Sequence, residues 1–317
     1  MPFMQRPLLA AALGVLAPSA LACSSCGCTL SSDWLVQGGH DSGFHADFRF
    51  DGFNQDDLRS GTGRVDRGSI ALPAGREIQQ ETLNRNYNLF LDYAPHESDW
   101  GFGAQVPYFD RYHTTILEGD TGVSTSHTKS LGDLRLLARY RGLSDDKSVG
   151  IQFGVKLPTG SIHNDFISGP QEGEPLDRGL QPGTGTTDLL LGAYAFGALN
   201  RDWDWFGEAI LQQPMNSRED FKPGTGVNLT LGARYMSFEN VRPQLQVNVR
   251  GERRESGASA DVDNSGATLV YLSPGVNVRL TDSASLYGYL QVPLYQRVNG
   301  FQLEPRWSAS VGVHFAL

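Results

Sequence analysis

The sequence lacks any long apolar run beyond its N-terminus, and it is poor in cysteine and in basic residues. The chain of 317 residues has three cysteines, and its 26 lysines and arginines are outnumbered by 35 aspartates and glutamates. A membrane-spanning helix needs about 18 or more consecutive apolar residues, so a helical membrane protein is excluded. The acidic balance argues against a nucleic-acid partner, because nucleic-acid phosphates bind basic surfaces.

Aromatic residues and glycine are plentiful. The chain contains 16 phenylalanines, 11 tyrosines, 5 tryptophans and 37 glycines, while hydrophobic residues make up 39%. That hydrophobic share is below the 45 to 50% or so of ordinary globular proteins. The aromatic side chains nevertheless supply enough apolar surface to exclude a disordered chain.

The N-terminus is typical of an export signal. Arg6 provides a positive start, residues 8–17 form an apolar core, and Ala20-Leu21-Ala22 is a small-residue cleavage pattern. We therefore expect residues 1–22 to be a cleaved signal peptide, with Cys23 first in the exported chain.

Beyond this segment, polar and apolar residues alternate. Residues 44–53 place Phe44, Phe48 and Phe50 on one face and Asp47 and Arg49 on the other, which is the period of a β-strand. The same pattern returns along the chain in stretches of similar length. Twelve strands are expected, at 44–53, 83–93, 100–108, 132–141, 149–157, 186–197, 204–213, 226–236, 243–253, 268–280, 284–295 and 305–315.

The connections between these strands alternate in length. Every second connection is a tight turn, and the other six are longer, including residues 54–80, 112–130, 159–184 and 254–266. Such sorting is typical of outer-membrane barrels, which have short periplasmic turns and long extracellular loops. We therefore predict an all-β fold over residues 43–317: a closed antiparallel transmembrane β-barrel of about 12 strands in the outer membrane of a Gram-negative cell.

Aromatic positions support a membrane barrel. Trp100 and Tyr108 stand eight residues apart on one apolar face, as do Trp307 and Phe315. At about 3.3 Å per residue and a tilt near 45°, this spacing is roughly 19 Å along the membrane normal, which suits two aromatic girdles in contact with outer-membrane lipid. The alternating end of the chain, residues 311–317, resembles the signal that barrel-assembly machinery recognises, so this machinery is an expected partner.

Three motifs carry a family resemblance. Gly132-Asp133-Leu134-Arg135, the segment 154–160, and Gln181-Pro182-Gly183-Thr184-Gly185 before residues 188–192 resemble the barrel family called the MetA pathway of phenol degradation. The similarity covers residues 130–200 and continues more loosely to the C-terminus. It implies an outer-membrane barrel that moves small, often aromatic, molecules, and it implies no catalytic residues.

The inward-facing positions of the predicted strands are rich in charge. Arginines there can form a constriction that favours anions or aromatic solutes, or the charges can form an ion-pair network that merely fills the barrel. Both interpretations stay open, and the loops 54–80 and 159–184 are long enough to fold inward or to lie on the surface. The candidate lumen residues are Asp47, Arg49, Arg135, Arg139, Arg141, Lys156, Glu208, Arg234, Arg250 and Arg279.

The three cysteines form a cluster near the expected mature N-terminus. Cys23, Cys26 and Cys28 offer soft ligands for copper or zinc, with His40 or His45 as a fourth. In an oxidising compartment, a disulfide or an intermolecular tether is the favoured alternative. We expect residues 23–42 to form a periplasmic segment, and a metal-binding or redox-linked function is the alternative to transport.

An enzyme is the remaining class of function. Barrel phospholipases need a histidine and a serine two residues apart near the outer leaflet. A His-x-Ser segment of this chain, His40-Asp41-Ser42, precedes the first strand on the expected periplasmic side. We therefore predict a non-enzymatic channel or transporter for small, aromatic or anionic solutes, with a lipid hydrolase as a less favoured alternative.

Overall fold

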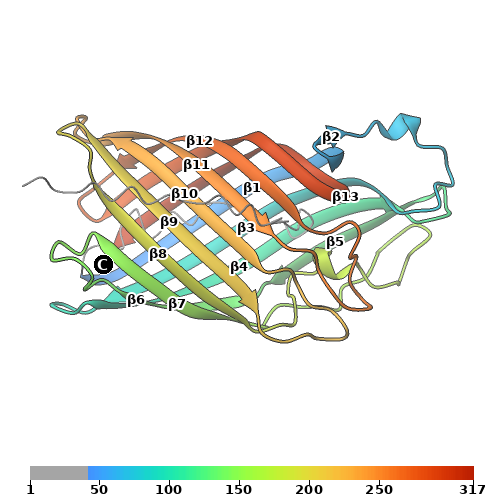
Figure 1. Cartoon of the computed structure of the whole chain (residues 1–317), viewed down its shortest axis with the longest axis horizontal. Helices are drawn as coiled ribbons and strands as arrows, with labels where there is room; N and C mark the ends of the chain where they lie inside the picture. Colours follow the sequence, from blue (N-terminus) through green and yellow to red (C-terminus); the bar gives the residue numbers. More distant parts are fainter. Residues whose placement is uncertain (1–41) are drawn as a thin grey trace, which may run out of the picture.

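The alternation of polar and apolar residues becomes the wall of a closed β-barrel (Figure 1). The computed structural model describes residues 42–317. Each ring strand pairs antiparallel with its neighbours, and β1 pairs with β13 to close the sheet, so the prediction of an all-β, closed antiparallel barrel is confirmed. The ring consists of β1 (Gly43–Gly61), β3 (Ile78–Ala94), β4 (Trp100–Ile116), β6 (Leu134–Tyr140), β7 (Val149–Leu157), β8 (Asp188–Ala198), β9 (Trp203–Pro214), β10 (Gly226–Tyr235), β11 (Val241–Glu252), β12 (Ala267–Arg279) and β13 (Ala284–Ala316).

Four smaller elements lie outside the ring. The strand β2 (Gly63–Arg64) pairs with β1, and β5 (Val123–Leu131) pairs with β4. Two 3-10 helices, η1 (Arg67–Ser69) and η2 (Arg178–Leu180), lie in connections. Among residues 42–317, no helix is long and apolar enough to cross a membrane.

The last strand, β13, runs along the wall of the barrel twice, in opposite directions. Its first half pairs with β12 as far as Val298, and its second half pairs with β1 from Val298 to Ala316. Both pairings are antiparallel, so the chain reverses at Asn299–Gly300, where Gly300 has a φ of +53°. The eleven labelled strands of the ring therefore make twelve passes, because the segments predicted at 284–295 and 305–315 are two halves of one strand.

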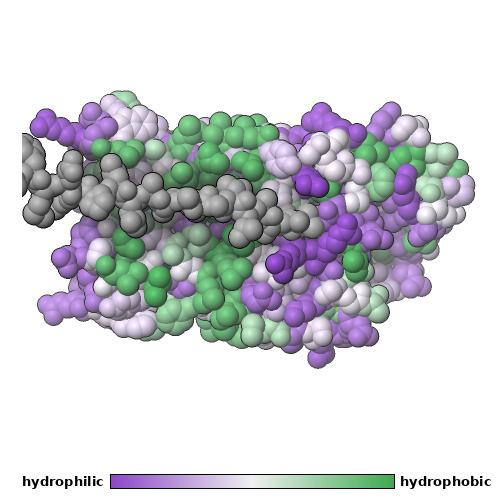
Figure 2. All heavy atoms as spheres, in the orientation of Figure 1, coloured by the Kyte–Doolittle hydropathy of each residue, from purple (hydrophilic) through white to green (hydrophobic). Residues whose placement is uncertain are grey.

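Burial is the reverse of that in a soluble protein. On β1, Asp47 and Arg49 are buried inside the barrel, whereas the intervening Phe48 is 49% exposed on the outside. The same alternation runs along β3, where Asn86 and Asn88 are buried. On the face that Figure 2 shows, hydrophobic side chains gather over the middle of the barrel and hydrophilic ones lie toward its ends.

The connections are sorted between the two ends of the barrel. Short turns at 95–99, 199–202, 236–240 and 280–283 lie at the end that holds the C-terminus, together with the turn at 141–148. The longer connections at 62–77, 158–187, 215–225 and 253–266 lie at the opposite end.

Three predicted loops differ from the structure. The loop predicted at 54–80 shrinks to 62–77 because β1 and β3 continue past the apolar band, and most of the loop predicted at 112–130 is strand in β4 and β5. In these stretches the residues on both faces of the strand are polar, so the sequence there lacks the alternation of polar and apolar residues that predicts a strand. The connection after residue 295 was expected to be long, but it is the tight reversal at Asn299–Gly300.

Candidate functional site

The connection between β7 and β8, residues 158–187, folds into the end of the barrel that carries the long connections. Its helix η2 is buried, and Arg111 on β4 donates a 2.7 Å hydrogen bond to the backbone oxygen of Leu180. Phe166, Leu176 and Leu180 pack together as a small apolar cluster within this connection. Of the two alternatives for this loop, the structure therefore has the inward one.

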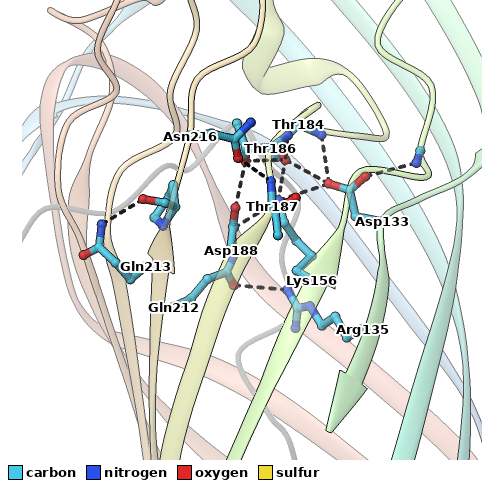
Figure 3. A network of polar contacts seen from close by, with 12 residues as sticks. Asp133, Arg135, Lys156, Thr184, Thr186, Thr187, Asp188, Gln212, Gln213 and Asn216 are labelled. Carbon is cyan, nitrogen blue, oxygen red and sulfur yellow. Dashed lines mark hydrogen bonds and ion pairs between the residues drawn. The ribbon is translucent and has the colours of Figure 1, made fainter.

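A buried ion-pair network anchors the loop to the wall (Figure 3). The Nζ atom of Lys156 on β7 lies 3.1 Å from a carboxylate oxygen of Asp133 and 3.0 Å from one of Asp188. Asp133 accepts hydrogen bonds from the backbone nitrogen and the hydroxyl of Thr184, at 3.0 and 2.9 Å. Asp188 accepts from the hydroxyl of Thr186 at 2.7 Å. The three motifs of the family resemblance thus meet at one point.

A cavity of about 120 Å³ lies beneath the loop, inside the barrel. Amide side chains, aromatic rings and prolines all contribute to its lining. Its lining includes Asn86, Asn88, Gln105, Pro107, Phe109, Arg135, Pro182, Gln212, Phe221 and Pro223. A solute in this cavity therefore meets hydrogen-bonding groups and apolar surface together.

Most cations around this cavity are neutralised by a carboxylate. Lys156 has two aspartate partners, Arg250 lies 2.5 Å from Glu252, and Arg178 lies 2.8 Å from Glu219. Arg135 differs, because it donates only to the amide oxygens of Gln105 and Gln212, at 3.5 and 3.3 Å. Among residues 42–317 no carboxylate lies within 4.0 Å of Arg135, so its charge is available to a solute.

A second cavity, of about 280 Å³, lies at the end with the short turns. Arg234, Arg242, Arg279 and His314 contribute to its lining. The guanidinium of Arg234 stands 5.1 Å from the ring centre of Phe206. Arg279 is exposed and binds the side chain of Asn240 at 3.2 Å, so it lies at the rim of the barrel.

The other predicted lumen residues lie inside the barrel with polar partners. Arg139 forms a buried ion pair with Asp92, and Arg49 forms one with Asp51 at 3.1 Å. These contacts match the interpretation of a filled interior. In the same way, Arg141 donates to the backbone oxygen of Ser98 at 3.0 Å, Asp47 accepts from Tyr287 at 2.7 Å, and Glu208 accepts from Gln152 at 2.6 Å.

The cysteine and lipase hypotheses concern the N-terminal segment. Cys23, Cys26, Cys28 and His40 lie outside the described residues, as does Asp41, so a copper or zinc site there stays a prediction. His45 is buried and stacks on His314, with 5.5 Å between ring centres. No group of three or more metal-ligating side chains occurs within residues 42–317.

Several site residues escaped the sequence analysis. Asp133 and Asp188 belong to the motifs of the resemblance, but their role as partners of Lys156 depends on three separate segments coming together. Arg178, Gln212, Phe109 and Phe221 had no signal, because none of them stands out from its neighbours in the sequence.

A solved structure shares this fold, and others match it more loosely. An outer membrane channel from Pseudomonas putida F1 superposes with a TM-score of 0.65 at 14% identity, covering 88% of this chain and 98% of that one. The CymD monoaromatic hydrocarbon channel gives a TM-score of 0.46 at 10% identity, covering 94% and 98% of the two chains. The NanC porin gives 0.47 at 11% identity, covering 86% of this chain and all of its own. The chain matches no protein-family model and no curated protein sequence.

Proposed function

We propose that the protein is an outer-membrane channel for small solutes, with a preference for anionic and aromatic ones. A β-structure can span a lipid layer only as a closed barrel, because every backbone polar group must be paired. This chain forms such a barrel, with apolar side chains outside and polar ones inside. Its fold is that of an outer membrane channel, which supports the same role here.

The orientation of the proposed channel follows from its connections. Short turns face the periplasm in outer-membrane barrels, and long loops face the outside. In this orientation the inward-folded loop 158–187 narrows the extracellular half, and the chain enters the wall from the periplasmic side at Gly43. Residues 1–22 serve as the export signal, and barrel-assembly machinery inserts the chain through its terminal strand.

One observation carries the solute preference: an unneutralised arginine beside aromatic rings in a small cavity. A guanidinium binds carboxylates through paired, charge-assisted hydrogen bonds. Phe109 and Phe221 offer apolar faces to the rest of the solute. A cavity of about 150 Å³ is known to hold one benzene ring, so a space of about 120 Å³ suits a solute with a single ring.

Conductance of the purified barrel in a planar bilayer tests this function. We expect discrete channels whose reversal potential in a KCl gradient shows a preference for chloride, and a reduction of current by millimolar benzoate. Arg135→Gln should lower the anion preference about fivefold, since one charge at 4 Å in water-like surroundings contributes about 1 kcal/mol. Arg135→Lys, which keeps the charge, should retain it. A folded barrel that conducts no ions would contradict the channel.

A further inference from the structure

Three charged side chains lie side by side on neighbouring strands, on the outer face of the barrel. Arg85 on β3 is paired in register with Asp110 on β4, and Asp110 is paired with Lys129 on β5. We call these three residues the charged row. The carboxylate of Asp110 lies 3.8 Å from Arg85 and 3.9 Å from Lys129, and it lies 2.8 Å from the Nε2 atom of His127.

This row borders the apolar band of the barrel. The next row toward the short turns is Tyr87, Tyr108 and Leu131, which are paired in register on the same three strands. The rings of Tyr87 and Tyr108 are 6.1 Å apart, as expected for an aromatic girdle. Two residues along a tilted strand add about 5 Å, so the charged row lies just beyond the level of the girdle.

The two cations, Arg85 and Lys129, have few partners within the barrel. Arg85 is 47% exposed and Lys129 is 55% exposed, and both share the single carboxylate of Asp110 at long distances. Neither cation makes another hydrogen bond or ion pair among residues 42–317. A guanidinium has five donors and an ammonium three, so most of these donors have no partner in the described part of the barrel.

We propose that the charged row binds the phosphate group of a lipid in the outer leaflet. The inference rests on the proposed membrane placement, which puts the row at the depth of the lipid headgroups. Basic clusters at this depth attract anionic headgroups, and phosphate oxygens accept strong charge-assisted hydrogen bonds from arginine and lysine. The row stands on the outside of the wall and lines neither cavity, so the partner is a neighbouring lipid rather than a transported solute.

Native mass spectrometry of the purified barrel, titrated with diphosphoryl lipid A in detergent, tests the proposal. We expect the wild type to retain the lipid, and Arg85→Gln with Lys129→Gln to weaken binding about tenfold or more. Arg85→Lys with Lys129→Arg keeps both charges and should bind nearly as well as the wild type. Arg201→Gln with Arg253→Gln removes the same charge elsewhere on the surface and should leave lipid binding unchanged.

Three results would overturn the proposal. These are wild-type affinity in the glutamine double variant, equal binding of dephosphorylated lipid A, or displacement of the lipid by inorganic phosphate at a similar concentration. Heat-modifiable gel mobility of each variant establishes that the barrel is folded. Conductance of the same preparations separates the two proposals. A barrel that conducts ions but does not bind lipid contradicts only the lipid site. A barrel that binds lipid but does not conduct ions contradicts only the channel.

Discussion

Arg135 on β6 donates a 3.3 Å hydrogen bond to the amide oxygen of Gln212 on β9. The strands β7 and β8 lie between β6 and β9 in the sheet, so this bond crosses the interior of the barrel. The amide nitrogen of Gln212 donates in turn to Asp188 at 2.6 Å. A neutral amide therefore links the cation to the carboxylate of Asp188. This arrangement holds the guanidinium in place without neutralising it.

Placing a carboxylate beside Arg135 should imitate the loss of its charge. Gln105 accepts a 3.5 Å hydrogen bond from Arg135, so the Gln105→Glu variant brings a negative charge to that point. We expect the chloride preference to fall about as far as in Arg135→Gln, although the arginine is retained. The reversal potential in a KCl gradient measures this. An unchanged preference would mean that Arg135 does not face the conducting path.

Arg139 should matter for stability rather than for selectivity. Its guanidinium is paired with Asp92 inside the wall, and removing one partner of a buried ion pair costs about 3 to 5 kcal/mol. Arg139→Gln should therefore lower the temperature at which the folded gel band disappears. Adding Asp92→Asn should recover part of the loss, because the buried carboxylate no longer lacks its partner. Equal melting of both variants would refute this account.

The contrast between Arg135 and Arg139 shows which features of the structure can be predicted from the sequence. Alternation is a local property, so it predicts most of the strands and assigns both arginines to the polar face, while the sorting of the connections predicts the closed fold. Whether each charge is paired depends on Asp92 and Gln212, which lie on other strands, and no local pattern contains that information. The polar ends of β1 and β4 were missed for a related reason, since the strands there continue past the apolar band of the barrel.

Lys156 should hold the inward loop in place. Lys156→Met removes the cation that Asp133 and Asp188 share, leaving two carboxylates side by side at the base of the connection 158–187. The two like charges repel each other and should loosen the attachment of the loop. We therefore expect a larger and noisier single-channel conductance. Lys147→Met at the short-turn end serves as the matched control and should conduct like the wild type. A quiet, wild-type conductance in Lys156→Met would argue against anchoring by this lysine.

The long connections should tighten as the pH falls. Burial raises the pKa of Glu77 to about 7, and the negative charge of Asp177 adds to this effect. Burial likewise raises the pKa of Asp177 to about 6, with a further contribution from Asp261. A carboxyl whose pKa is raised on folding favours the folded loops at low pH, and this advantage is lost as the pH rises through 6 to 7.

Hydrogen exchange of peptides from 62–77 and 158–187 measures this dependence. Protection should be greater at pH 5 than at pH 8, after correction for the intrinsic exchange rate. The neutral variant Glu77→Gln with Asp177→Asn should show little difference between the two values. Equal protection of the wild-type loops at both pH values would contradict the prediction.

Labelling of intact cells should reveal the orientation of the barrel. Gly119 lies in the turn between β4 and β5, in open space, and accepts a short epitope tag there. We expect antibody to reach this tag from outside, whereas a tag at Asp145 in the turn after β6 should be reached only after the outer membrane is permeabilised. The opposite accessibility would reverse the proposed topology.

The pairing of β1 with the end of β13 sets the order of events in biogenesis. His45 lies opposite Ala316, so the seam joins positions separated by almost the whole described chain. Among residues 42–317, the end of β13 is the partner that covers this edge of β1, and an unpaired strand edge invites association with other chains. The nascent polypeptide therefore carries two such edges until its final residues arrive, and a truncation before Asn299 should remain permanently unclosed. Contacts of such long sequence separation form slowly, which makes protection of both edges during assembly a requirement of this topology.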